Sequence, residues 1–157
     1  MNSGTEKLLW VLAAGLLLFG GAGAVIKYTQ RGLRNNNPGN IRKGEDWQGL
    51  AAEQPDEAFA TFVSPEYGIR AMAKVLVNYQ NLYDLNTVQK LINRWAPPSE
   101  NDTASYIASI ADALGVSPTT PIDVRSALPV LIPAIIRHEN GLNPYSSSTI
   151  QAGISMV

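Results

Sequence analysis

The sequence contains no cysteine, a single histidine and nearly equal numbers of basic and acidic residues. Without cysteine there can be no disulfide and no cysteine-based metal site, and cysteine usage gives no information on the redox compartment. The single histidine, His138, argues against a histidine-rich metal centre and against a Ser-His-Asp triad. The net charge of −1 gives no overall basic field, so we expect no nucleic-acid partner.

Nucleotide-binding signatures are missing as well. The chain has no G-x-G-x-x-G segment and no Walker-type loop, which leaves nucleotide chemistry without support. No internal repeat or low-complexity tract stands out. We expect no cofactor and no metal, in a chain whose 157 residues suffice for one domain with a modest core.

A long apolar stretch near the N-terminus is the strongest coarse signal. From Leu8 to Ile26 the chain runs 19 residues without a charge. At ~1.5 Å per residue a helix of that length spans roughly 28 Å, close to the hydrocarbon core of a bilayer. Trp10 and Tyr28 lie near its two ends, as aromatic residues do at membrane interfaces.

Two other interpretations of this stretch compete with a membrane anchor. The small residues at 22–24 resemble a signal-peptide cleavage site, and a buried helix of a soluble domain is also apolar. A buried helix would usually carry a polar stripe, which is missing here. We therefore favour an uncleaved anchor over residues 1–28, with the lipid bilayer as partner, followed by a folded domain over 29–157.

Helical spacing and capping residues dominate the rest of the chain. Ser64, Pro65 and Glu66 form a helix start, and Asn86-Thr87 and Asn101 or Asp102 can cap two further helices. Predicted helices cover 65–83, 88–95, 103–114, 127–140 (begun by Ser126, with a kink at Pro133) and 148–156. Residues 58–63 alternate small and large side chains and read as a short strand or extended edge. The domain is predicted to be mainly α with a small extended part.

The late predicted helix carries a carboxyl group on its apolar face. Its apolar positions are Leu128, Leu131, Ile132, Ile135 and Ile136. Glu139 continues the same stripe, in the last turn, where partial burial and the helix dipole both raise the pKa of a carboxyl group. A glutamic acid that stays protonated near neutral pH can protonate a glycosidic oxygen. Alternatively Glu139 turns outward and is solvated or pairs with Arg137, which its position alone favours.

The segment around Glu139 resembles a known catalytic signature. "HENGLNPYS" is similar to the motif of goose-type lysozymes and soluble lytic transglycosylases, in which a helix ends in glutamate before Asn-Pro and Ser. The residues that match in order are Glu139, Asn140, Asn143, Pro144 and Ser146. The resemblance implies that Glu139 is the catalytic acid/base, with Asn140, Asn143 and Tyr145 on the substrate. Asn140 stands where serine is usual, and the groove would have to come from upstream segments, because only 18 residues follow Glu139.

A second resemblance covers nearly all of the chain from Arg31 to Gly153. "RGLRNNNPGNIR", "SPEYGIRA", "INRWAPPSENDT" and "IIRHENG" together resemble a family of small phage proteins that carry an RGxRNNNPGNIR motif. Its members are described as virion structural proteins or as lysozyme-like, lytic-transglycosylase-like peptidoglycan hydrolases. The resemblance implies a small lysozyme-like α (α+β) domain of phage origin.

The asparagine-rich segment of that motif allows two interpretations. Asn40 and Arg42 can meet the N-acetyl, hydroxyl and carboxylate groups of a glycan. Alternatively the asparagines stabilise a turn and satisfy buried backbone groups, which is favoured for 35–37 and evenly balanced for Asn40. Trp47, Trp95 and Tyr67 are more typical of a core than of a sugar platform.

Two acidic residues further along can supply a second carboxylate. Glu100 and Asp102 lie on a predicted loop and helix start, where one of them can position water or stabilise an oxocarbenium-like transition state. Helix capping is the alternative, and Asp102 fits it well.

The sequence thus predicts a membrane-anchored phage peptidoglycan hydrolase of the lytic transglycosylase or muramidase type. Its partners would be glycan strands, the bilayer and other virion proteins, and its location an internal virion membrane or the host inner membrane facing the periplasm. The alternative is a non-catalytic virion structural or membrane protein with a lysozyme-like body.

Overall fold

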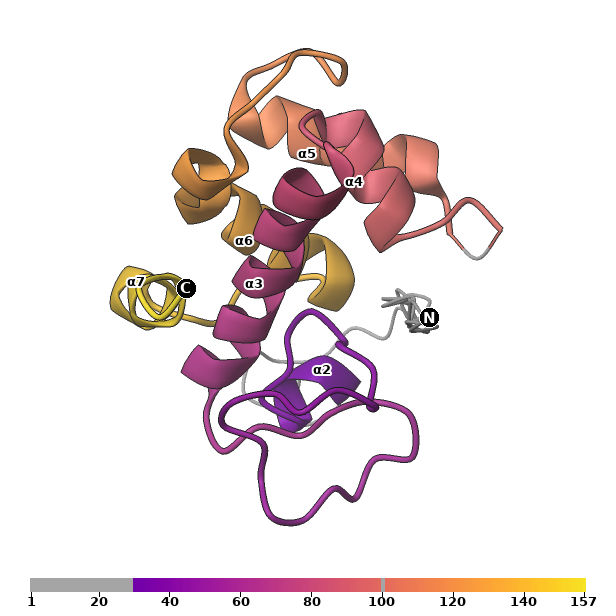
Figure 1. Ribbon diagram of the computed structural model, residues 1–157. Helices are drawn as coiled ribbons and strands as arrows, with labels where there is room; N and C mark the ends of the chain where they lie inside the picture. The colour runs from indigo at the N-terminus through magenta and orange to yellow at the C-terminus, as the bar shows by residue number, and fades with distance from the viewer. Residues whose placement is uncertain (1–29, 100) are drawn as a thin grey trace, which may run out of the picture.

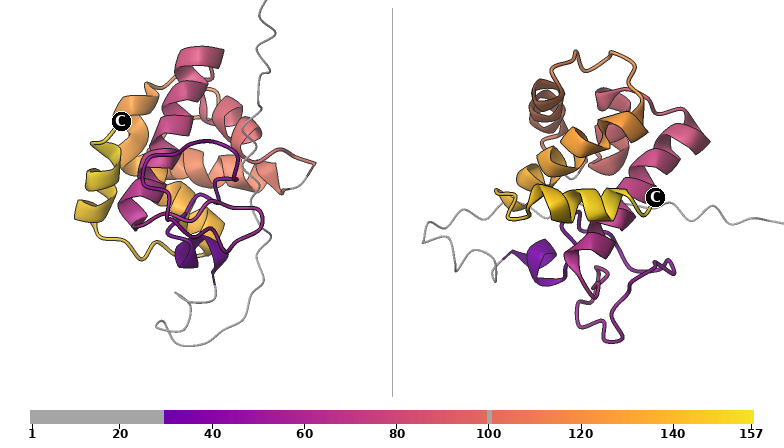
Figure 2. Two further views of the ribbon diagram at one scale, coloured as in Figure 1. Left: turned by 60° about the horizontal axis from the view of Figure 1, so that its bottom comes forward. Right: turned by 90° about the vertical axis from the view of Figure 1, so that its left-hand side faces the viewer.

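A computed structural model describes residues 30–99 and 101–157 (Figure 1). The helices are α2 (Arg31–Arg34), α3 (Pro65–Tyr83), α4 (Val88–Trp95), α5 (Thr103–Leu114), α6 (Val124–Asn140) and α7 (Ser147–Ile154). Helix α3 packs against α6 and α7, and α5 packs against α4 and α6 (Figure 2). Residues 35–64, which connect α2 to α3, form an irregular layer at one end of α3 (Figure 1).

Most helix boundaries follow from capping side chains. The side chains of Thr87, Asp102, Asp123 and Ser146 each accept a hydrogen bond from a backbone N–H in the first turn of α4, α5, α6 and α7. The predicted span of α3 is confirmed, with Pro65 at its first position. The predicted start of α6 is wrong, because Asp123 rather than Ser126 caps it and Ser126 donates to that cap.

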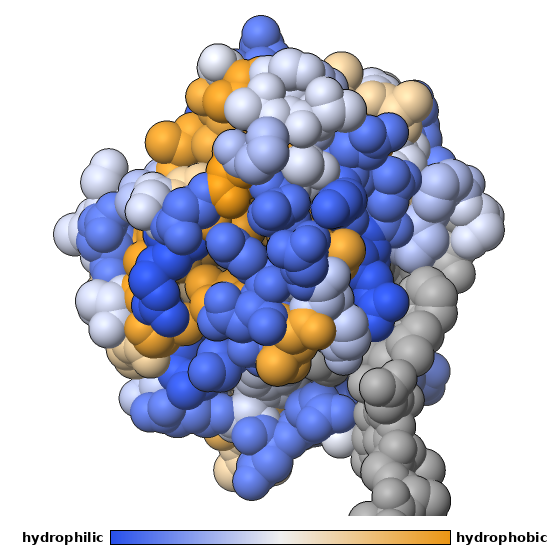
Figure 3. Space-filling model, turned by 45° about the horizontal axis from the view of Figure 1, so that its top comes forward, coloured by the Kyte–Doolittle hydropathy of each residue, from blue (hydrophilic) through white to orange (hydrophobic). Residues whose placement is uncertain are grey.

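Apolar residues from all the longer helices form one core. Its largest fully buried side chains include Trp95, Tyr106, Phe62, Ile41, Ile69 and Met72. Close helix packing requires a small residue at Gly153, where a Cβ would lie 2.5 Å from Cγ2 of Ile69 in α3. On the face of the molecule in Figure 3, the surface is largely polar, with separate apolar areas.

The fold-class prediction is wrong about the extended part of the domain. No strand occurs in residues 30–99 or 101–157, so the domain is helical rather than α+β. The segment predicted as a strand forms only isolated antiparallel bridges, between Arg42 and Phe59 and between Leu50 and Phe62. In residues 30–99 and 101–157, no helix is long and apolar enough to cross a membrane. The predicted anchor over Leu8 to Ile26 lies outside the described residues.

Side-chain amides hold the irregular layer together. Asn37 donates to the carbonyls of Ile41 and Ala60 and accepts from the N–H of Ile41. Asn36 donates to the carbonyl of Phe62, and Asn35 donates to the carboxylate of Asp56. Asn36 and Asn37 thus take the place of part of a sheet ladder, since their carboxamides pair backbone groups that a strand partner would otherwise pair.

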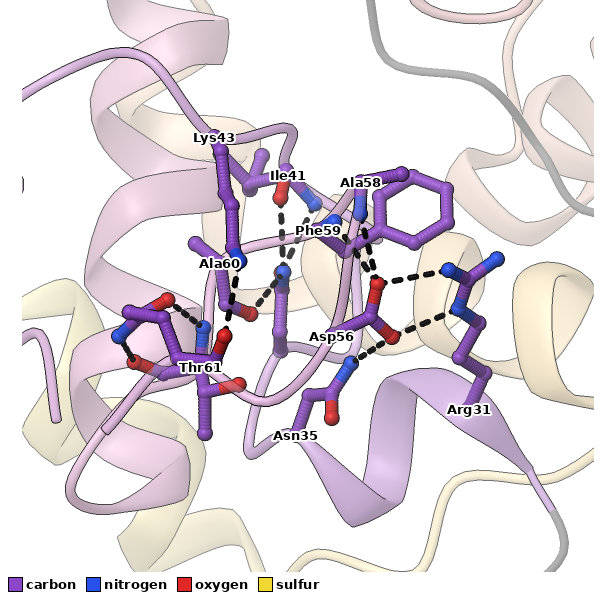
Figure 4. Close-up of polar contacts among 11 residues, drawn as sticks. Arg31, Asn35, Ile41, Lys43, Asp56, Ala58, Phe59, Ala60 and Thr61 are labelled. Carbon is purple, nitrogen blue, oxygen red and sulfur yellow. Dashed lines mark hydrogen bonds and ion pairs between the residues drawn. The ribbon is translucent and has the colours of Figure 1, made fainter.

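Asp56 is the second organising group of this layer (Figure 4). Its carboxylate accepts two hydrogen bonds of 2.6 Å from Arg31, one from Asn35 and two from the N–H groups of Ala58 and Phe59. The hydrogen bond from Arg31 is the main reason why the pKa of Asp56 lies well below its usual value. Asp56 therefore ties α2 to the turn at 56–59 as a carboxylate.

Candidate functional site

Glu139 lies in the last turn of α6 and is buried, with 6% of its surface exposed. The apolar positions of the same helix, Ile132, Ile135 and Ile136, are fully buried. Glu139 therefore faces the interior, and the alternative in which it turns outward to solvent is wrong. Arg137, its proposed partner in that alternative, is exposed.

Three side chains from three different segments donate hydrogen bonds to the Glu139 carboxyl. The Nε1 of Trp95, at the end of α4, lies 3.1 Å from Oε1. The hydroxyl of Tyr106 in α5 lies 2.8 Å from the same oxygen. The Nδ2 of Asn40, from the irregular layer, lies 3.3 Å from Oε2. We call Glu139, Trp95, Tyr106 and Asn40 the Glu139 cluster.

The protonation of Glu139 is set by opposing effects. Burial disfavours its charged form and raises its pKa above the ordinary value. The hydrogen bonds from Tyr106, Trp95 and Asn40 favour the charged form and offset part of that rise. The pKa of Tyr106 is raised well above its usual value, chiefly by burial and then by the Glu139 charge, so Tyr106 remains a donor.

His138 lies beside the cluster. Its ring stacks on that of Tyr106, with the centroids 3.6 Å apart and the planes 15° from parallel. Burial lowers the pKa of His138, and the nearby Asp102 raises it to a smaller extent. This stack covers one face of the Tyr106 ring.

Asn140 and Asn40, both predicted on the substrate, lie inside the protein. Asn140 is 2% exposed, and its Nδ2 donates to the carbonyls of Pro38 and Ile136. Asn140 thus fastens the end of α6 to the asparagine-rich turn. Asn40 adopts a left-handed backbone conformation with a φ of 50°, which asparagine tolerates better than most residues.

The other predicted substrate residues make their contacts elsewhere. The side chain of Asn143 accepts from the N–H of Tyr145 in the connection between α6 and α7. Tyr145 packs on the core, and burial raises its pKa to about 12. The guanidinium of Arg42 lies 5.6 Å from the centre of the Phe59 ring. The structure therefore places only Asn40 of the predicted substrate residues in hydrogen-bond contact with Glu139.

The two candidates for a second carboxylate were Glu100 and Asp102. Asp102 is exposed and caps α5 by accepting from the N–H of Ser105. This is the alternative role that the sequence allowed for it. Glu100 lies outside the described residues. Across residues 30–99 and 101–157, no three His, Cys, Asp or Glu side chains gather as metal ligands would.

Sequence reasoning missed Tyr106 and treated Trp95 mainly as a core residue. Both are fully buried aromatic residues that keep a polar atom needing a partner. That requirement was a usable signal, although the sequence does not say which acceptor each one reaches.

A surface depression is formed by residues outside the Glu139 cluster. It has a volume of about 360 Å³ and is lined by Arg31, Arg34, Asn35, Pro55, Asp56 and Glu57. No member of the Glu139 cluster lines it. Two of its lining residues, Arg31 and Asp56, form an ion pair with each other.

Comparison with family models finds no match to this chain. Among curated proteins, the chain is 40% identical over 132 residues to Protein P5 of Pseudoalteromonas phage PM2. The aligned region covers 82% of this chain and 82% of that protein.

Proposed function

The chain belongs to the family of Protein P5 of Pseudoalteromonas phage PM2, and we propose that it cleaves peptidoglycan glycan strands with Glu139 as the catalytic acid. The phage relative supports a phage role, and virion association is the location that we propose with it. The resemblance of "HENGLNPYS" to lytic transglycosylases and goose-type lysozymes supports the reaction.

The protonation and position of Glu139 carry the proposal. Its carboxyl is buried in the last turn of a helix, and its pKa is raised by that burial. A general acid for glycosidic cleavage needs a pKa near the working pH, and desolvation is the usual means of raising it.

The two oxygens of Glu139 have different roles in this proposal. Oε1 already accepts from Trp95 and Tyr106, so the transferable proton belongs on Oε2. That proton passes to the glycosidic oxygen between N-acetylmuramic acid and N-acetylglucosamine as the bond from this oxygen to C1 of the muramic acid breaks. The carboxylate then takes a proton from the attacking group. If that group is the C6 hydroxyl of the muramic acid the product is a 1,6-anhydro sugar, and if it is water the product is a free reducing end.

Access to Oε2 lies on the side of Asn40. The glycosidic oxygen must replace the Asn40 carboxamide as the partner of Oε2, and that contact is the longest of the three at 3.3 Å. Arg42, Asn143 and Tyr145 are proposed to bind sugars further along the strand.

A non-catalytic phage structural protein is the second candidate. It is favoured by the 6% exposure of Glu139 and by the donors on both of its oxygens, since such a carboxylate can serve only to join α4, α5, α6 and the irregular layer.

Digestion of purified peptidoglycan by the full chain tests the proposal, with released muropeptides identified by mass spectrometry. We expect wild type to release anhydro or reducing-end fragments and Glu139→Gln to be slower by about 100-fold or more. Asp112→Asn, which changes an exposed carboxylate on α5, is the matched control and should keep full activity.

Folding of each variant is checked by circular dichroism and thermal melting. A folded Glu139→Gln with wild-type activity would remove Glu139 from the mechanism. Absence of any product from folded wild type, from acidic to alkaline pH, would leave the structural role instead.

A further inference from the structure

The carboxamide oxygen of Asn40 is the starting observation. Asn40 is 3% exposed, and its Oδ1 is buried with no hydrogen-bond partner among the described residues. Leaving a buried carbonyl oxygen unpaired is destabilising, so such an atom calls for an explanation.

The groups around this oxygen include two further oxygens. A Cβ on Gly32 would lie 2.9 Å from the Oδ1 of Asn40, 2.9 Å from the backbone oxygen of Asn37 and 3.0 Å from the Oδ1 of Asn140. Three oxygens therefore converge on the space beside the Gly32 Cα. A donor in place of the Asn40 Oδ1 would suit this space better than a third acceptor.

The opposite side of the carboxamide faces Glu139. The Nδ2 of Asn40 donates to Oε2, which suits an ionised carboxylate. When Oε2 carries a proton, that oxygen becomes a donor, and the group facing it should be an acceptor. A half-turn of the carboxamide would present Oδ1 to this proton and place Nδ2 beside Gly32, among the oxygens of Asn37 and Asn140.

We propose that Asn40 is a positioning residue whose carboxamide turns over with the protonation of Glu139. In the ionised state Nδ2 donates to Oε2, and in the protonated state Oδ1 accepts from the Oε2 hydroxyl while Nδ2 donates to the oxygens beside Gly32. Each state of the carboxyl then has a matched partner. This role rests on the proposed function, in which Oε2 gives up and regains a proton in each catalytic cycle.

The terminal torsion of asparagine permits this motion. It is an sp³–sp² torsion with a broad, roughly two-fold profile, and the two ends of a carboxamide are nearly equal in size. The backbone of Asn40 need not move, and the bond from its N–H to the carbonyl of Asn37 is kept in both states.

The other titratable and charged groups near the site lie on α4, α5 and α6. Tyr106 of α5 donates to Oε1 and has a pKa well above its usual value. His138 of α6 stacks on Tyr106, and Asp102 at the start of α5 acts on His138. In α4, the guanidinium of Arg94 lies over the rings of Tyr79 and Tyr83, 5.9 and 5.1 Å from their centres.

The Glu139→Gln variant tests this proposal directly. Trp95 and Tyr106 are both donors and require an oxygen at the Oε1 position. The glutamine NH₂ must then occupy the Oε2 position, so Asn40 must present its Oδ1. The variant should hold Asn40 in the turned-over state at every pH.

The measurement is nuclear magnetic resonance of the isotope-labelled full chain. In the turned-over state the Asn40 Hδ2 protons lie beside Gly32 and give a nuclear Overhauser effect to its Hα. In wild type we expect a severalfold loss of this effect as the pH rises, with the same midpoint as the ¹³Cδ titration of Glu139. In Glu139→Gln we expect a strong effect that does not change with pH.

Asn36 provides an internal control, because it has a similar φ of 49° and its Nδ2 donates to the carbonyl of Phe62. Its side-chain amide signals should not follow Glu139. An Asn40–Gly32 effect that is constant with pH in wild type would overturn the proposal, and the wild-type titration decides this even if Glu139→Gln does not fold. No substrate is used, so failure here is separate from failure of the peptidoglycan assay.

Discussion

The hydroxyl of Tyr106 lies 2.8 Å from the Oε1 of Glu139, the shortest hydrogen bond that this buried carboxyl receives. The two residues lie on α5 and α6, which pack against each other. This bond stabilises the charged form of Glu139 in a site where burial disfavours it. Tyr106 therefore lowers the proton affinity of the proposed catalytic acid and offsets part of the effect of burial.

Tyr106→Phe is expected to raise the pKa of Glu139 further. The variant removes a donor to the carboxylate and keeps the ring that stacks on His138. If Glu139 acts as the acid, the high-pH limb of the pH–activity profile should move to higher pH, because the carboxyl keeps its proton longer. Tyr83→Phe, on an exposed tyrosine of α3, is the control. A profile with an unmoved alkaline limb would mean that this hydrogen bond does not govern the reacting proton.

Glu139→Gln should alter how stability depends on pH. Because the pKa of Glu139 in the folded protein is raised above its ordinary value of 4.5, the folded state binds more protons than the unfolded state between these two values. The contribution of Glu139 to the free energy of unfolding of wild type should therefore decrease as the pH rises through this window. Glu139→Gln should lack that decrease in urea denaturation series. Parallel pH dependences in the two proteins would contradict the assigned direction.

Asp56→Asn should destabilise the irregular layer. The variant loses the ion pair with Arg31, in which the Arg31 side chain is 42% exposed and that of Asp56 is buried. We therefore expect a cost of about 1–3 kcal/mol. Because the pKa of folded Asp56 is depressed, its contribution is present above the ordinary value of 3.8 and is lost as the pH falls below it. Urea denaturation at neutral and acidic pH measures both effects, and Glu57→Gln on the exposed neighbouring residue is the control. Equal stability of the variant and wild type at neutral pH would count against this role.

Gly153→Ala should loosen the contact between α7 and α3. The added Cβ would lie 2.5 Å from Cγ2 of Ile69 and 2.8 Å from the backbone oxygen of Glu66, so one helix must shift. We expect a destabilisation of about 1–3 kcal/mol, measured by thermal and urea unfolding. Gln151→Ala, at an exposed position of α7, should have little effect. A stabilised Gly153→Ala would show that the helices separate at no cost.

The helices could be predicted because their signals are local. Thr87 and Asp102 cap α4 and α5 as expected, and Gly115 ends α5. The start of α6 was predicted three residues too late, because Asp123 and Ser126 are both good capping residues and only the folded chain shows which one accepts. The alternation at 58–63 resembled a strand, but its partners pair through single bridges and asparagine side chains.

The site could be predicted only in part. The spacing of Glu139 from Ile132 and Ile135 was enough to indicate the buried face of α6. Its donors were not predictable in the same way, because Trp95, Tyr106 and Asn40 lie 44, 33 and 99 positions away. Their convergence depends on how α4, α5 and the irregular layer pack, which no local pattern encodes.

The asparagine-rich turn has a consequence for the surroundings of Glu139. Trp95 and Tyr106 reach Glu139 from helices, whereas Asn40 reaches it from a segment that has no regular structure of its own. A folding intermediate with its helices packed and residues 35–41 still undocked would leave Oε2 open to water. The ionisation of a single carboxyl group would thus report whether this segment is docked on the helices.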